Sequence, residues 1–159
     1  MNADDFLVKG LGQGALGDYQ GAIEDFNQAL LLNATNADIY YNRGMAYYRL
    51  GNHQAALEDF NETLWINPIY TLAYIGRGLV CRQLGNLIAA IDDCERALQI
   101  EPNLAEAYYN RGLIRVELGD RTGAIWDLQK AALFFDKQGN KAAYHQTHSL
   151  LEMQLTAYS

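Results

Sequence analysis

The sequence predicts an all-α fold built from antiparallel helix hairpins, and three observations lead to this prediction. First, short motifs that contain glycine recur along the chain every 34 residues. Second, apolar residues within each repeat are spaced three and four residues apart, which is typical of amphipathic helices. Third, only two prolines occur among the 159 residues, so long stretches of chain can stay helical.

The repeat is clearest in two series of glycines. The first series is Gly10, Gly44, Gly78 and Gly112. The second series is Gly17, Gly51, Gly85 and Gly119. An alanine and an aspartate keep the same period: Ala22, Ala56, Ala90 and Ala124, and Asp25, Asp59, Asp93 and Asp127. Four units therefore follow one another within a single domain over residues 1–159, at 3–36, 37–70, 71–104 and 105–138.

Each unit is predicted to hold two helices joined by a tight turn, as the second unit illustrates. Its first helix covers 37–50, and Gly51-Asn52 then supplies a turn in which glycine adopts a positive φ. Its second helix covers 53–66 and ends at Asn67-Pro68.

A further helix at about 140–157 is expected to cap the last unit, because no hairpin of a repeat stack buries its apolar face alone. Its apolar stripe is Tyr144, His148, Leu151, Leu155 and Tyr158.

The residues at seven positions of each unit carry a family resemblance. Positions 4, 8, 11, 20, 24, 27 and 32 of the second unit are Tyr40, Gly44, Tyr47, Ala56, Phe60, Thr63 and Pro68. This pattern resembles the tetratricopeptide repeat, although Ala34 and Asp136 replace the last proline in the first and fourth units. The resemblance implies a right-handed α-solenoid. Glycine at position 8 and alanine at position 20 would let the two helices of a hairpin touch.

The resemblance also implies a function, since the first helices of such hairpins line a concave groove that binds a peptide or helix of a partner protein. The partner-binding residues carried over to this chain are Tyr41, Asn42, Met45, Tyr48, Ile75, Leu79, Arg82, Tyr109, Asn110 and Leu113. Aromatic and methionine side chains suit such adaptable surfaces. An alternative is that part of this line packs against the C-terminal helix or a second copy of the chain.

One variant of the family, the carboxylate clamp, holds the acidic C-terminus of chaperones with lysine, asparagine and arginine. Only Asn42 or Asn110 matches that pattern here. The positions of the charged clamp residues hold Leu7, Leu11, Leu72 and Gly76. The clamp is therefore not expected.

A basic residue repeats at position 7 and an acidic residue at position 23. The basic residues are Lys9, Arg43, Arg77 and Arg111. They suggest either an anion-binding ladder or a structural ladder of ion pairs between adjacent hairpins. Arginine favours the second interpretation, because its fork pairs with a carboxylate through two hydrogen bonds.

No cofactor, metal site or catalytic activity is expected. His53, His145 and His148 lack a cluster of further ligands, and Cys81 and Cys94 fall on core positions. The glycine-rich stretch 10–17 lacks the ending of a phosphate-binding loop, and its glycines at 12 and 14 should weaken the first helix. Pairs of acidic residues that are neighbours in the sequence recur with the 34-residue period, so we expect them to have a structural role and not to form a catalytic pair.

The net charge of −7 argues against nucleic acid and anionic membranes as partners. No apolar run approaches the ~20 residues of a membrane span, and a cytoplasmic location is expected. The predicted function is a non-catalytic scaffold or adaptor, such as an assembly factor, that binds another protein. The alternative is a structural module that forms dimers or stacks through its terminal repeats.

Overall fold

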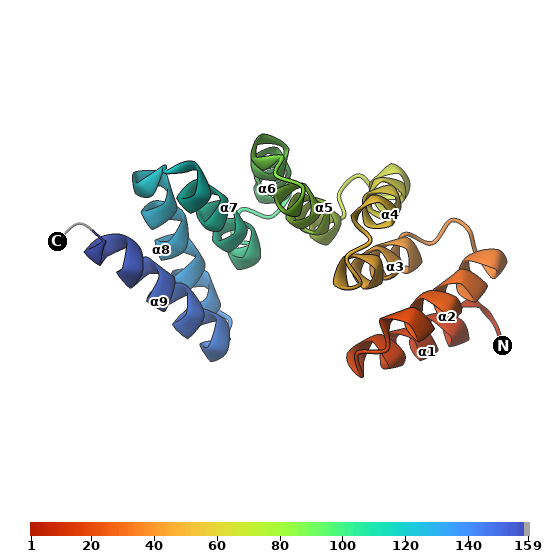
Figure 1. The fold of residues 1–159 in the computed structure, drawn as a ribbon. Coiled ribbons are helices and arrows are strands. Elements are labelled where there is room, and N and C mark those ends of the chain that lie inside the picture. Colours follow the sequence, from red (N-terminus) through yellow and green to blue (C-terminus); the bar gives the residue numbers. More distant parts are fainter. Residues whose placement is uncertain (158–159) are drawn as a thin grey trace. The chain divides into compact units, whose positions relative to one another are not determined.

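The computed structural model describes residues 1–157 of the chain, and every element of regular structure in that part is an α-helix. The helices, labelled in Figure 1, are α1 (Ala3–Ala15), α2 (Tyr19–Leu32), α3 (Ala37–Arg49), α4 (His53–Ile66), α5 (Thr71–Gln83), α6 (Leu87–Ile100), α7 (Ala105–Leu118), α8 (Arg121–Lys137) and α9 (Lys141–Thr156). The odd-numbered helices α1 to α7 begin at the first residues of the four 34-residue units.

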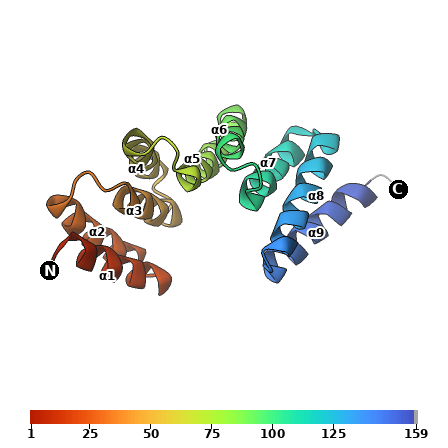
Figure 2. The ribbon, with the colours of Figure 1, turned by 180° about the vertical axis from the view of Figure 1, so that it is seen from behind.

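The helices form two compact units. The first runs from Met1 to Val80 and contains α1 to α4 and most of α5, and the second starts at Cys81 and contains the end of α5 and α6 to α9. Within the units, α1 pairs with α2, α3 with α4 and α7 with α8 as helix hairpins, which can be followed from both sides in Figures 1 and 2. The prediction of a single domain over residues 1–159 stays a prediction.

Glycine and asparagine form the turns inside the hairpins. Gly51 has a φ of 79°, which favours a residue without a Cβ, and Oδ1 of Asn52 accepts a hydrogen bond from the backbone N–H of Ala55 at 3.2 Å. The predicted turn at Gly51-Asn52 is therefore confirmed. The same hydrogen bond, from the backbone N–H three residues on to the capping side chain, begins five other helices, at Asn2, Asp18, Asn86, Asp120 and Asn140.

The two helices of a hairpin approach closely at the glycine of position 8, as the sequence predicts. A Cβ added to Gly10 would lie 2.6 Å from Cε1 of Phe26, and one added to Gly44 would lie 3.1 Å from Cε1 of Phe60. The alanines at position 20 are fully buried: Ala22, Ala56, Ala90 and Ala124. Backbone contact between the helices thus requires the small residues at both positions.

A second close approach, absent from the sequence prediction, joins neighbouring hairpins. A Cβ added to Gly76 of α5 would lie 2.6 Å from Cζ of Phe60 on α4. Gly76 is buried by this contact, so it belongs to the packing between α4 and α5.

The last helix, α9, packs against α8, as expected of a cap. Its buried residues are Thr147 and Leu151, and the Thr147 hydroxyl donates a hydrogen bond to the carbonyl oxygen of Ala143. The predicted stripe is partly wrong, because Leu155 is exposed and Thr147 takes the central buried place. Tyr158 lies outside the described residues. The exposed side of α9 carries polar residues such as His145, Ser149 and Glu152.

We predict that Gly12→Ala and Gly10→Ala have opposite effects on stability. A Cβ at Gly12 meets nothing within 4 Å, so alanine should stabilise α1 by up to ~1 kcal/mol. A Cβ at Gly10 would collide with the ring of Phe26, so Gly10→Ala should lower stability by ~1–3 kcal/mol. Thermal melts followed by circular dichroism measure both changes. A stabilised Gly10→Ala variant would contradict the close packing of α1 on α2.

Candidate protein-interaction site

The predicted partner-binding residues fall into two groups, one in each compact unit. Residues up to 80 carry Tyr41, Asn42, Met45 and Tyr48 on α3 and Ile75 and Leu79 on α5. Residues from 81 onward carry Arg82 at the end of α5 and Tyr109, Asn110 and Leu113 on α7.

The first group includes three residues that the structure brings to one hollow of about 310 Å³, between α1, α2 and α3. Tyr41, Asn42 and Met45 line it from α3. Its other lining residues are Gly10, Leu11, Gly14, Ala15, Tyr19, Ala22, Phe26, Ala46 and Arg49. We call this feature the α1–α3 hollow.

The hollow exists because the residues of α1 that face it are mostly glycine and alanine, which have little or no side chain. Gly14 occupies position 12 of its unit, where the other three units have Tyr48, Arg82 and Val116. The sequence shows this difference, but from the sequence alone the glycine predicts only a weaker helix. The structure shows that the missing side chain leaves space beside Leu11 and Met45.

Tyr41 forms a rigid part of the wall. Its ring centroid lies 5.1 Å from that of Tyr70 and 6.1 Å from that of Phe60. Burial raises the pKa of the Tyr41 hydroxyl above its ordinary value, so this side chain stays neutral at physiological pH. The wall therefore offers a fixed aromatic surface.

The other predicted residues have different surroundings. Ile75 is 7% exposed, so most of its surface is already covered. The guanidinium of Arg82 is paired with the carboxylate of Glu117. The ring of Tyr109 packs edge-on against Phe135 at 6.3 Å. Asn110 and Leu113 are half-exposed on α7, as Leu79 is on α5.

The repeated basic and acidic residues form ion pairs inside hairpins. Arg43 of α3 donates two hydrogen bonds to the Asp59 carboxylate of α4, at 2.8 Å from Nε and 2.7 Å from Nη2. These hydrogen bonds raise the pKa of the Arg43 guanidinium. Arg43 also contacts the preceding hairpin, but through a neutral side chain. Its Nη1 donates a hydrogen bond to Oδ1 of Asn27 on α2, at 2.7 Å.

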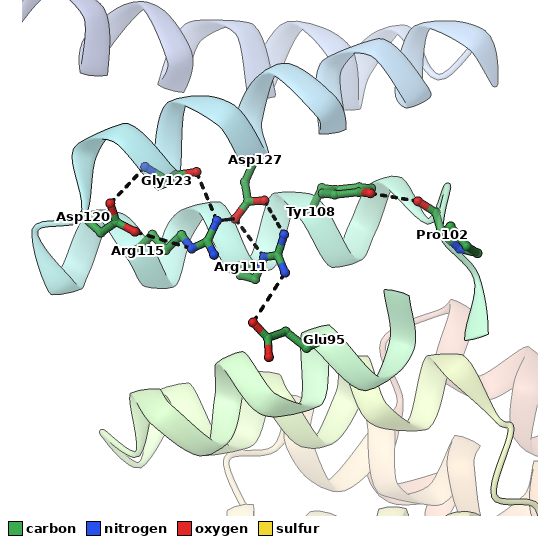
Figure 3. A network of polar contacts seen from close by, with 8 residues as sticks. All are labelled: Glu95, Pro102, Tyr108, Arg111, Arg115, Asp120, Gly123 and Asp127. Atoms are coloured by element: carbon green, nitrogen blue, oxygen red, sulfur yellow. Dashed lines mark hydrogen bonds and ion pairs between the residues drawn. The ribbon is translucent and has the colours of Figure 1, made fainter. Parts of the chain in front are cut away.

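The predicted ladder of ion pairs between adjacent hairpins is therefore wrong, because Asp59 and Asp127 each lie in the same hairpin as the arginine that binds them. Positions 7 and 23 face each other across the close contact of one hairpin, which brings the cation to its own aspartate. In the last hairpin both Arg111 and Arg115 bind Asp127, which is 0% exposed, and Arg111 also reaches Glu95 of α6 at 3.7 Å (Figure 3). These cations hold the fold together.

The first hairpin has a weaker version of the same pair. Nζ of Lys9 contacts only Oδ1 of Asp25, at 3.0 Å. Oδ2 of Asp25 is buried and has no hydrogen-bond partner. A lysine cannot supply the two parallel donors of an arginine fork.

Comparison with known proteins shows to which family this arrangement of helices belongs. A model described as TPR repeat matches residues 15–51 and 78–119, and two models described as tetratricopeptide repeat match residues 37–70 and 105–134. The chain belongs to the tetratricopeptide repeat family. The predicted fold class, an all-α solenoid of helix hairpins, is confirmed with it. A comparison with curated proteins gave no match.

Solved structures, some of them described as tetratricopeptide repeat (TPR) proteins, resemble the chain over most of its length. MamA is 29% identical, with 87% of this chain and 81% of that chain covered and a TM-score of 0.78. The first TPR of Spaghetti (RPAP3), bound to the HSP90 peptide SRMEEVD, is 32% identical, with 74% and 94% covered and a TM-score of 0.72. TTC0263, a TPR protein of Thermus thermophilus, is 22% identical, with 96% of this chain and 91% of that chain covered and a TM-score of 0.75. At this identity the likeness shows the fold alone.

Tetratricopeptide repeat proteins are generally non-catalytic interaction modules. The family and these neighbours support the coarse function expected from the sequence, a protein–protein interaction scaffold.

The histidine and cysteine side chains of this TPR protein are dispersed. Within residues 1–157, no three His, Cys, Asp or Glu side chains gather as a metal site. Burial raises the pKa of the Cys94 thiol to about 12, so it stays protonated at neutral pH. In the same part of the chain, no helix combines the length and the hydropathy needed to cross a bilayer.

We predict that Lys9→Arg stabilises the first hairpin of this TPR protein. The arginine fork should bond both oxygens of Asp25 and satisfy Oδ2, as Arg43 does for Asp59. The expected gain is roughly 1 kcal/mol, or about 3 °C in melting temperature. Lys9→Arg in an Asp25→Asn background serves as the control and should gain less than half of this. An equal gain in both backgrounds would show that the unpaired oxygen is not the cause.

Proposed function

We propose that the chain binds a peptide or helical segment of a partner protein through residues on the first helices of its hairpins. The observation that carries this proposal is the α1–α3 hollow, where Leu11, Tyr41 and Met45 present apolar surface that the fold leaves open. Binding a partner side chain there would remove this apolar surface from water. An adaptor in the assembly of a larger complex is the form of this function that we favour, and a cytoplasmic location stays a prediction.

The nature of these side chains supports peptide binding. Tyrosine supplies contact area at low entropic cost, and methionine adapts to the shape of its partner. The remaining sequence-derived residues, Tyr48, Ile75, Leu79, Arg82, Tyr109, Asn110 and Leu113, are proposed as further contacts. Of these, Arg82 would have to exchange its pairing with Glu117 to contact a partner directly.

A neighbour in the same family supports peptide binding as the mode. The first TPR of Spaghetti is bound to an HSP90 peptide. The present chain has leucine at 7, 11 and 72 and glycine at 76, where the chaperone clamp has charged or amide side chains. We therefore propose a partner segment that differs from the chaperone C-terminus.

Self-association is the second candidate, and exposed apolar residues outside the hollow favour it. Leu16 is 89% exposed, Trp65 84% and Ile69 69%. The outer side of α1 argues against stacking of two copies through the N-terminal hairpin. At position 3 of its unit α1 has the exposed Asp5, whereas α3 has the fully buried Ile39 at the same position.

We predict that Met45→Glu weakens binding of partner peptides at least 10-fold, because it places a carboxylate in the hollow. The probes are twelve-residue peptides selected from a displayed random library on the wild-type protein. Fluorescence polarisation with synthetic copies measures their affinity. Trp65→Glu is the matched control, since Trp65 is exposed on α4 and does not line the hollow. It should change affinity less than 2-fold.

Two results would count against peptide binding on this face. One is a library that yields no binding peptide. The other is equal affinity for wild type and a folded Met45→Glu variant. Sedimentation over a range of concentrations separates the second candidate, because self-association through exposed apolar residues predicts dimers that Trp65→Glu dissociates.

A further inference from the structure

The α1–α3 hollow holds one charged residue, Arg49, and otherwise apolar, glycine and uncharged polar residues. Arg49 stands in the last turn of α3 and is exposed. No aspartate or glutamate lines the hollow. A ligand entering it would therefore meet a positive charge, although the chain as a whole has a net charge of −7.

Arg49 differs from the other arginines of the chain, all of which have a polar partner. These are Arg43, Arg77, Arg82, Arg96, Arg111, Arg115 and Arg121. Within residues 1–157, Arg49 makes no hydrogen bond and no ion pair. Its five donors are available to a ligand.

A structural role for Arg49 would lie at the end of its own helix. A cation in the last turn interacts favourably with the helix dipole, typically by 0.3–1 kcal/mol. This role would appear in the melting temperature and would not discriminate between ligands. The two roles can therefore be separated by measuring stability and binding on the same variant.

The size of the hollow limits what it can take. A cavity of roughly 150 Å³ lined by apolar side chains is enough to hold benzene. The hollow, at about 310 Å³ and open to solvent, has room for one large apolar side chain such as leucine, methionine or phenylalanine. It lies at the lower end of the ~300–1,000 Å³ that small-molecule sites occupy.

We propose that the α1–α3 hollow takes one apolar side chain of a partner segment, and that Arg49 binds the carboxylate of an aspartate or glutamate next to it in that segment. The guanidinium fork matches a carboxylate through two hydrogen bonds, and the apolar side chain covers Leu11, Met45 and Tyr41. This inference rests on the proposed function and names the kind of segment that binds.

Gly14 makes the anchor position specific to the first hairpin. A Cβ at this position would meet only Cβ of Ala22, at 3.9 Å, which is an ordinary contact. A leucine at 14 can therefore be built without a collision at its Cβ, and its branched end would enter the hollow. Gly12, two residues earlier on α1, has nothing within 4 Å of a Cβ and does not line the hollow.

The first test compares Gly14→Leu with Gly12→Leu, using the selected peptides made with amidated C-termini. Both substitutions replace glycine within α1, so both should raise the melting temperature. Only Gly14→Leu fills the hollow, and we expect it to weaken peptide binding at least 10-fold. Gly12→Leu should leave the affinity within 2-fold of wild type.

The second test combines Arg49→Gln with a peptide in which the acidic residue is changed to its amide. For wild type, we expect the amide peptide to bind about 10-fold more weakly than the acidic one. For Arg49→Gln, the two peptides should bind within 2-fold of each other. Arg96→Gln, on α6, is the matched control and should keep the 10-fold preference.

The outcomes separate this inference from the proposed function. If Met45→Glu abolishes binding but Gly14→Leu does not, or if the acidic preference survives Arg49→Gln, the inference is wrong and peptide binding on this face stands. If no peptide is selected, both fail. If Gly14→Leu alters the sedimentation of the protein without peptide, a second copy occupies the hollow and the inference is again wrong.

Discussion

The close contact between the two helices of a hairpin is the constraint on which the rest of the structure depends. Glycine at position 8 faces a large residue of the second helix, as Gly10 faces Phe26. At this separation the cation of position 7 reaches the buried aspartate of position 23, as Arg43 reaches Asp59. A larger residue at position 8 would separate the helices and leave the aspartate buried without a partner, which is costly.

The repeat made most of the fold predictable from the sequence. Four copies in phase locate the turns, because glycine and asparagine at Gly51-Asn52 have a local physical role that recurs unchanged. Arrangements between elements were less predictable. Position 7 could pair with an aspartate of its own or of the neighbouring hairpin, and only the structure shows that Arg43 uses Asp59 for charge and Asn27 for the neighbour. Aligning the repeats shows that Gly14 has no side chain at position 12, but only the structure shows that a hollow is left there.

The arginines divide into two kinds by their partners. In the last hairpin, Arg111 and Arg115 neutralise Asp127, and these charges stabilise the fold. Arg49, beside Met45 and Leu11 on the hollow, has no polar partner among residues 1–157. A scaffold that keeps its structural arginines paired can leave an unpaired arginine for recognition, where the partner supplies the carboxylate.

Hydrogen–deuterium exchange with and without a selected peptide tests most directly the claim that partners bind at the α1–α3 hollow. Our account predicts slower exchange in the second half of α1 and in α3, around Gly14 and Arg49, and unchanged exchange in α4. Protection confined to α4 and the segment around Trp65 and Ile69 would contradict it, because those residues lie outside the hollow.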